Sequence, residues 1–212
     1  VEEVELEDLP TILGSADITT DSGYTGRFAS LSRFEFKESL TNYLLTATTS
    51  YKSYTDLLNS GKMISNFKNY DTDPNTSDFI NGYHLNTTVR APFVRLRLNS
   101  ALDNTRLDGM SKGQRFDALA YPSITGLTNN IPSSPTTGSN NRISPFSGFP
   151  ALSIPAGAVN YEKRSAYPMN VNIEFIAREF AEPTLFEIAA AFEKINPSRM
   201  VPIHTPALKA AL

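Results

Sequence analysis

The sequence predicts a layered α/β domain built around a mixed sheet. The main support is residues 144–197, which read as a tight Gly/Pro loop, a strand, a second loop, a second strand and a helix. Amphipathic helical patterns and one short apolar strand precede this unit. Helices and strands in this order are typical of a domain in which helices cover a sheet. The 212 residues suffice for one domain with a hydrophobic core, or at most two small ones.

Composition and charge exclude several classes of protein. Hydrophobic residues make up 40% of the chain and charged residues 19%, which is ordinary for a soluble globular protein. A net charge of −3 argues against a dedicated nucleic-acid-binding protein, which is usually basic. No stretch approaches the roughly 18 apolar residues that span a bilayer, so no membrane span is expected. The absence of cysteine excludes disulfides and thiolate metal sites.

The first seven residues predict a β-strand that has already begun at Val1. Val4 and Leu6 fall on one face, and Glu5 and Glu7 fall on the other. No initiator methionine and no secretory signal pattern precede them. Because a globular chain rarely begins inside a strand, we expect either a processed fragment or an upstream segment in another chain.

A helix is predicted after a turn-rich surface loop over residues 8–31, which contains one short helical turn. Ser32 followed by Glu35 matches a capping box, in which each side chain accepts a hydrogen bond from the other residue's backbone N–H. Apolar residues then recur every three or four positions as far as Ala47. This spacing is typical of an amphipathic helix.

Two further helices are expected before the first strand of the sheet. The first covers about Tyr51 to Leu58 and ends at Asn59-Ser60-Gly61. The second runs from about Ser77 to Asp103, with Gly82 and Pro92 as the points where it would break in two. A positive face accompanies this second helix, and we favour a solvated surface over an anion or phosphate site. That face consists of Arg90, Arg95, Arg97 and Arg106.

Two N-glycosylation sequons occur, Asn75-Thr76-Ser77 and Asn86-Thr87-Thr88. Such triplets are frequent by chance, and they matter only in a protein that a eukaryote secretes. With no signal peptide visible, the sequence leaves secretion open and assigns no compartment.

The last third of the chain alternates loops with regular elements. A short strand over Asp117–Pro122 leads into a long irregular loop over residues 122–149, and loops of this length are usually functional or disordered. A strand follows at Ala151–Pro155. The next strand, Val171–Ala177, places Val171, Ile173 and Phe175 on a buried face and Asn172 and Glu174 on the other. A helix then begins near Pro183 and ends at Asn196-Pro197.

No catalytic constellation is visible in the sequence. The only histidines are His84 and His204, and no G-x-S-x-G elbow presents a serine. No pair of ligands has metal-binding spacing, and no glycine-rich loop cradles a phosphate. Three lysines stand in contexts where solvated side chains are expected: Lys37, Lys52 and Lys62. We therefore expect no metal, no cofactor and no catalytic residue in this chain.

Five segments resemble, in family order, the C-terminal part of the amidase signature hydrolases. Residues 144–157 (SPFSGFPALSIPAG) resemble the family's GxPAxSxPxG strand, and residues 172–185 (NIEFIAREFAEPTL) resemble the strand and helix that follow. Residues 117–122 (DALAYP) resemble its DALxxPT strand, and residues 34–44 its EFKxxLxxYL helix. The opening VEEVELEDLP resembles the strand after the family's GAxVxxV segment. The peptide-amidase and fungal amidase-like branch is the most similar.

This resemblance implies a mixed-sheet α/β/α amidase signature fold, of which residues 1–212 are the C-terminal portion of a single domain. The family hydrolyses carboxylic amides with a serine nucleophile, a second serine in a cis peptide and a lysine base, without a metal. Those residues lie in an upstream Gly/Ser-rich segment that has no match here. The implied partner is therefore the N-terminal portion of the same enzyme, as a cleaved or separate chain. The implied substrate is a small amide or peptide amide, and this chain alone is expected to be inactive.

The resemblance also implies a substrate-binding role for Phe146, Ser147 and Phe149 in an acyl-side pocket. The alternative is that the phenylalanines belong to the core and that the loop is surface. Ala177-Arg178 replaces the family's Gly-Arg, and Ser165–Asn170 replaces a short glycine-containing turn. Because of these two differences, the loop shape and hence the substrate are not carried over from the family. A non-catalytic amidase-like scaffold or binding module is the alternative function. Ser144, Ser147 and Ser153 are expected to be loop and strand residues.

Overall fold

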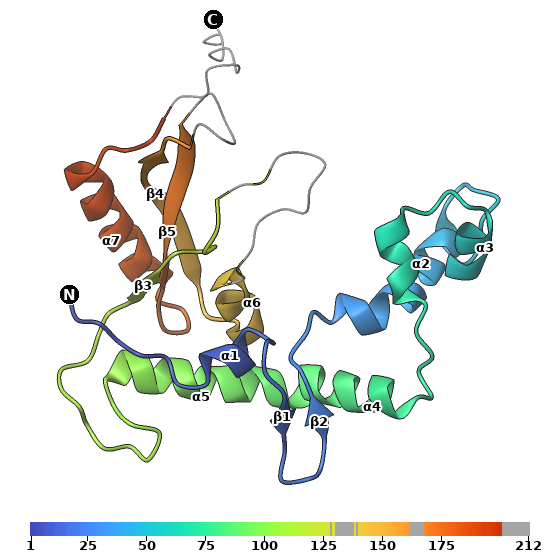
Figure 1. The fold of residues 1–212 in the computed structure, drawn as a ribbon, viewed down its shortest axis with the longest axis horizontal. Coiled ribbons are helices and arrows are strands. Elements are labelled where there is room, and N and C mark those ends of the chain that lie inside the picture. Colours follow the sequence, from blue (N-terminus) through green and yellow to red (C-terminus); the bar gives the residue numbers. More distant parts are fainter. Residues whose placement is uncertain (128, 130–137, 139, 162–167, 201–212) are drawn as a thin grey trace, which may run out of the picture. The chain divides into compact units, whose positions relative to one another are not determined.

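The structure is a computed structural model that describes residues 1–127, 129, 138, 140–161 and 168–200 (Figure 1). The chain divides into two compact units. One, here called the helical unit, is Leu6–Arg95. The other, here called the sheet unit, combines Val1–Glu5 with Leu96–Leu212. Among the described residues, no helix is both long and apolar enough to cross a membrane.

The helical unit consists of short helices and one small hairpin (Figure 1). Its elements are α1 (Leu9–Ile12), β1 (Ile18–Thr19), β2 (Thr25–Gly26), α2 (Ser32–Thr46), α3 (Tyr54–Asn59), the 3₁₀ helix η1 (Ser65–Tyr70), α4 (Ser77–His84) and the π-helical turn η2 (Leu85–Val89). The helix α5 (Arg90–Asp103) begins in this unit and continues into the sheet unit.

Side-chain caps start two of these helices. The Ser53 hydroxyl accepts a hydrogen bond from the Asp56 backbone N–H at the start of α3. Thr76 does the same for the Phe79 N–H at the start of α4. Such caps satisfy backbone donors that have no partner inside the first helical turn. The helix expected near Tyr51–Leu58 is therefore confirmed, with its start moved to Tyr54.

The helix predicted after Ser32 is confirmed as α2, but its predicted capping box is wrong. The N-cap residue is Leu31, and α2 has no side-chain cap. The Ser32 hydroxyl lies 2.9 Å from the Ser30 hydroxyl, and Glu35 accepts a hydrogen bond from Tyr83 instead of the helix terminus. The chain enters the helix one residue earlier than the capping pattern requires, so Ser32 already lies inside the helix.

The long helix predicted over Ser77–Asp103 is interrupted, although at neither of the two points expected. The interruption is the π-helical turn Leu85–Val89 between α4 and α5. It precedes Pro92, which has no N–H for the carbonyl four residues earlier. Gly82 lies inside α4, where a Cβ would stand 2.7 Å from the Phe34 ring. Glycine at 82 therefore permits a close contact with Phe34 and does not break the helix.

The strand predicted over the first seven residues is wrong. Residues 1–6 have no regular secondary structure, and a turn leads into α1. No strand of the described residues pairs with this segment. An alternating pattern becomes a strand only where a neighbouring strand takes its backbone hydrogen bonds.

The sheet unit contains a three-stranded sheet in the order β3-β5-β4 (Figure 1). The strands are β3 (Leu119–Tyr121), β4 (Ala151–Val159) and β5 (Met169–Ile176), and both pairs are antiparallel. The register shifts between Pro155 and Gly157, as expected where proline removes a ladder donor. The α/β class predicted from the sequence is confirmed, and any parallel pairing stays a prediction.

One face of this sheet is covered by α7 (Glu182–Ile195) (Figure 1). Leu185 and Ala189 of the helix are buried, and Phe192 meets Phe175 of β5 edge to face at 6.0 Å. Pro183 lies in the first turn, where its missing N–H has no intrahelical partner to lose. The predicted strand, turn and helix of this region are therefore confirmed.

The irregular loop predicted over residues 122–149 is wrong at its C-terminal end. Residues 140–142 form the 3₁₀ helix η3 (Asn140–Arg142), and α6 (Ile143–Ser147) follows directly. The rest of that loop lies partly outside the described residues, as does the Ser165–Asn170 segment. Pro145 falls in the first turn of α6, where its missing N–H costs no hydrogen bond.

Candidate functional site

The three residues predicted to bind substrate come together at the end of α6. Phe146 and Ser147 are its last residues, and Phe149 follows after Gly148. Gly148 has φ 79°, a left-handed conformation that glycine adopts without a Cβ clash. The three side chains are buried, with exposed fractions of 7%, 1% and 3%. The structure thus brings the predicted residues together, and their contact with a substrate stays a prediction.

Two serine hydroxyls hold this turn in place. The Ser147 hydroxyl donates to the carbonyls of Ile143 and Ser144, at 2.9 and 3.0 Å, and accepts from the Phe149 N–H at 3.0 Å. The Ser144 hydroxyl donates to the Phe149 carbonyl at 2.8 Å. Both hydroxyls therefore satisfy backbone groups at the end of α6, which is the role of a helix cap and not of a nucleophile.

A polar row crosses the face of the sheet opposite to Phe175 and α7. Glu174 on β5 lies directly between Tyr121 on β3 and Ser153 on β4. The Tyr121 hydroxyl donates to the Glu174 carboxylate at 2.6 Å, and the Ser153 hydroxyl lies 3.3 Å from that of Ser123. The sequence pattern had placed Glu174 on the polar face, and the side chain is instead 8% exposed. The hydrogen bond from Tyr121 offsets part of the free-energy cost of burying the Glu174 carboxylate.

The Tyr121 phenol is a hydrogen-bond donor and not an acid at neutral pH. Burial and the hydrogen bond to the Glu174 carboxylate both raise its pKa well above the usual 10.0. A neutral phenol beside a carboxylate can hold that carboxylate in one orientation by donating to it. Its oxygen can also accept a hydrogen bond from a donor group of a ligand.

We expect Tyr121 to keep its proton at pH values where other tyrosines ionise. Because the folded state holds the proton more tightly than the unfolded state, this contribution to stability is full below pH 10 and declines as the pH rises further. Burial also raises the pKa of Tyr54, so absorbance titration of the phenolate should show both Tyr54 and Tyr121 ionising late. The matched Tyr121→Phe variant should lose one late-titrating group and leave the early part of the curve unchanged. An identical late phase in that variant would contradict the assignment.

Arg178 forms a second polar centre in the sheet unit. Its guanidinium donates to the Asp103 carboxylate at 2.6 Å and to the Phe116 carbonyl at 2.7 Å. Arg115 also bonds Asp103, at 2.9 Å. The hydrogen bond from Arg178 is the main cause that lowers the Asp103 pKa. The sequence singled out Arg178 as a family motif residue, but nothing in the sequence pattern pointed to Asp103.

A small hollow of about 190 Å³ lies elsewhere in the sheet unit, and the three predicted residues do not line it. Its lining consists of Glu2, Glu3, Val4, Glu5, Ser100, Ala101, Asn104, Thr105, Lys112 and Phe116. The volume is below that of typical pockets for drug-sized ligands, which start near 300 Å³.

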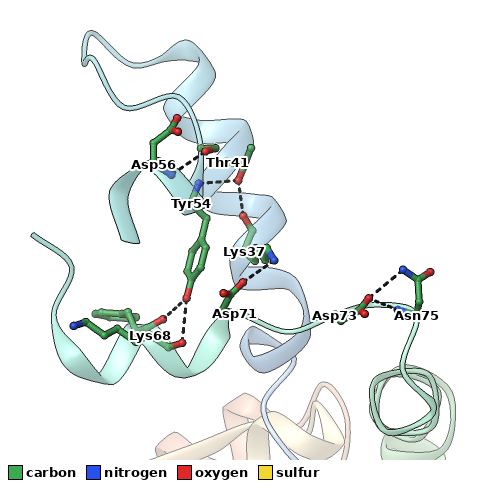
Figure 2. A network of polar contacts seen from close by, with 10 residues as sticks. Lys37, Thr41, Tyr54, Asp56, Lys68, Asp71, Asp73 and Asn75 are labelled. Carbon is green, nitrogen blue, oxygen red and sulfur yellow. Dashed lines mark hydrogen bonds and ion pairs between the residues drawn. The ribbon is translucent and has the colours of Figure 1, made fainter. Parts of the chain in front are cut away.

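Three further residues that the sequence singled out, His84, Lys37 and Arg90, have structural partners in the helical unit. His84 stacks on Tyr24 at 3.8 Å, and Lys37 pairs with Asp71 at 2.7 Å (Figure 2). Arg90 was expected on a solvated face, which is wrong: it is buried and donates to the Ala29 carbonyl. His204 lies outside the described residues. Within the part of the chain that the structure describes, no three His, Cys, Asp or Glu residues are grouped as metal ligands.

Comparisons with known proteins find similarity only among solved structures. No protein-family model matches the chain, and no curated protein matches it. The crystal structure of PAM12A gives a TM-score of 0.53 at 21% identity, over 80% of this chain and 34% of that one. The native peptide amidase from Stenotrophomonas maltophilia gives 0.48 at 20% identity, over 80% and 33%. The peptide amidase PAM in complex with the competitive inhibitor chymostatin gives 0.49 at 20% identity, over 80% and 34%.

The similarity to PAM12A concerns the fold, because the identity is only 21%. It extends along most of this chain, whereas this chain spans about a third of the length of each of the three structures. The chain is thus an α/β protein whose fold is similar to part of the fold of PAM12A.

Proposed function

We propose that this chain is the C-terminal part of an amidase-type hydrolase that cleaves carboxylic amide bonds. The serine nucleophile, the cis serine and the lysine base would lie in an upstream segment or a separate chain. The observation that carries the proposal is the fold similarity to PAM12A over 80% of this chain and 34% of that one. The family-like segments at residues 117–122, 144–157 and 172–185 fall in the same order as in the amidase signature family.

The same three segments build the centre of the sheet unit. They form β3, the turn from α6 into β4, and β5 with the start of α7. They also carry the polar row and the Arg178 centre, so the motif residues share one hydrogen-bonded scaffold. In the proposed enzyme this scaffold supports one wall of the substrate site. Phe146, Ser147 and Phe149 lie on that wall, and the substrate is a small amide or peptide amide.

Reconstitution with the upstream portion tests the proposal. We expect the complex to release ammonia from a C-terminally amidated peptide, with a kcat in the usual enzyme range of about 1–1000 s⁻¹. The chain alone should release none above the buffer rate. Replacement of the upstream serine nucleophile by alanine should remove the activity without changing assembly. A complex that assembles and releases no ammonia from a panel of amides would overturn the hydrolase.

The other candidate is an amidase-like scaffold that binds amides without cleaving them, because the sequence shows no catalytic constellation. In that case the reconstituted complex binds a peptide amide in calorimetry and leaves it intact. An intact bound amide therefore supports the scaffold, and released ammonia supports the enzyme.

A further inference from the structure

An exposed aromatic side chain stands in a strained turn between β5 and α7. Phe180 is 86% exposed, although burial of a phenylalanine is favourable. Its φ is 62°, in the left-handed region that bulky residues rarely adopt. Both properties disfavour phenylalanine at this position in the isolated chain.

The turn itself explains why the backbone is left-handed. The Ala181 N–H donates to the Arg178 carbonyl at 3.0 Å, so residues 178–181 form a β-turn with Phe180 at its third position. A positive φ at that position favours glycine or asparagine. Arg178 is held by Asp103 and by the Phe116 carbonyl, which fixes the start of the turn. The scaffold therefore presents the Phe180 ring outward at a defined place.

The length of the similar structures indicates what covers this ring. PAM12A is matched over only 34% of its chain, so about two thirds of that fold has no counterpart in these 212 residues. Phe186, in the first half of α7, is also 64% exposed. Two large aromatic side chains exposed near one end of a helix are typical of the buried centre of an interface.

We propose that Phe180 is an anchor that inserts into an apolar pocket of the upstream portion of the same enzyme. The inference rests on the proposed function, because the upstream portion that would contact Phe180 is part of the proposed enzyme. The strain in the turn is then retained because a preorganised aromatic ring binds with little loss of conformational freedom. Phe186 contributes the next part of the same docking surface.

Measured affinity tests the anchor. The upstream portion, supplied as a separate polypeptide, is titrated with the 212-residue chain in a calorimeter. Phe180→Ala should weaken binding at least about 30-fold, as expected for a central aromatic anchor. The matched control is Ile195→Ala, because Ile195 is 81% exposed at the far end of α7. That variant should change affinity less than about threefold, as peripheral contacts do.

Phe180→Gly separates docking from folding. Glycine suits the positive φ, so this variant should melt no lower than the unsubstituted chain and yet bind the upstream portion as weakly as Phe180→Ala. An optical reporter gives an independent readout, because the chain contains no tryptophan. Phe180→Trp should show a blue shift of its emission when the upstream portion is added, after subtraction of the unsubstituted complex. Ile195→Trp should show none.

The outcomes distinguish this anchor from the hydrolase. Normal affinity of Phe180→Ala or Phe180→Gly in a complex that hydrolyses amides overturns the anchor and leaves the function standing. Lost affinity of both variants in a complex without activity supports the anchor and overturns the function. No binding by the unsubstituted chain overturns the anchor. A homodimer of the chain that Phe180→Ala dissociates also overturns it, since the occupant is then a second copy.

Discussion

Replacing Tyr54 with alanine is expected to lower the free energy of unfolding of the helical unit by about 4 kcal/mol. The Tyr54 side chain has no exposed surface, and its ring meets that of Phe36 edge to face at 6.4 Å. Its hydroxyl donates to the carbonyls of Phe67 and Lys68, at 2.8 and 3.3 Å. Alanine would leave a cavity the size of the ring and remove both hydrogen bonds.

Tyr54 has this effect because it joins three helices (Figure 2). Its backbone N–H donates to the Thr41 hydroxyl of α2, which itself donates to the Lys37 carbonyl. Its own hydroxyl reaches the 3₁₀ helix η1, and the pair of Lys37 with Asp71 closes the same cluster. The side chains of Lys37 and Asp71 are 38% and 46% exposed, so their ion pair contributes little by itself and the buried ring is the main stabilising part.

Urea unfolding followed by far-UV circular dichroism measures the change, and amide hydrogen exchange locates it. Protection should fall together in α2, α3 and η1 of the Tyr54→Ala variant. The matched Tyr54→Phe variant keeps the ring and should lose only about 1 kcal/mol for the hydroxyl. Equal losses in the two variants would show that packing of the ring is not the dominant contribution.

The elements that the sequence predicted well are those whose own residues carry the pattern. The helix α7 has a proline in its first turn and an apolar face that rests on Phe175, and α2 has an apolar residue every three or four positions. The strand β5 alternates along its length. Each pattern is local and predicts the element correctly, but burial follows it less closely: Leu44 is the only buried residue of α2, and the buried residues of β5 are Glu174 and Ile176.

The elements that the sequence missed depend on partners far along the chain. Glu174 looked like an exposed strand residue until Tyr121, 53 positions earlier, supplied its hydrogen bond. The first residues alternate correctly but have no neighbouring strand among the described residues. Gly82 looked like a helix breaker, whereas glycine at this position leaves room for the ring of Phe34. A one-dimensional pattern does not contain such long-range contacts.

The candidate site was predicted in part for the same reason. The family-like motif located Phe146, Ser147 and Phe149, which the structure does bring together. The motif did not indicate that the Ser147 hydroxyl caps α6, because a cap depends on where the helix ends. Neither did it indicate that Phe180 is exposed, because a phenylalanine between a strand and a helix is compatible with a core position as well.

Replacing Asn86 with leucine is expected to lower the free energy of unfolding by about 3 kcal/mol. Asn86 is 3% exposed in the helical unit. Its carbonyl oxygen accepts from the Ala29 N–H at 2.6 Å and from Arg90 at 3.2 Å. Its amide donates to the carbonyls of Gly82 and Arg27, at 2.8 and 3.3 Å. Leucine fills the space but leaves several of these buried groups without this partner, and each lost bond costs about 1 kcal/mol or more.

Two variants of the same sequon make the test specific. Asn86→Asp keeps the acceptor for Ala29 and Arg90 and loses the donor for Gly82 and Arg27, so its stability should lie between those of the leucine variant and the parent. Thr87→Ala alters an exposed neighbour and should change the unfolding free energy by less than about 0.5 kcal/mol. Because the Asn86 amide is buried and hydrogen-bonded, only Asn75 of the two sequons is exposed in the folded chain. A leucine variant as stable as the parent would show that other partners satisfy the Ala29, Gly82 and Arg27 backbone groups.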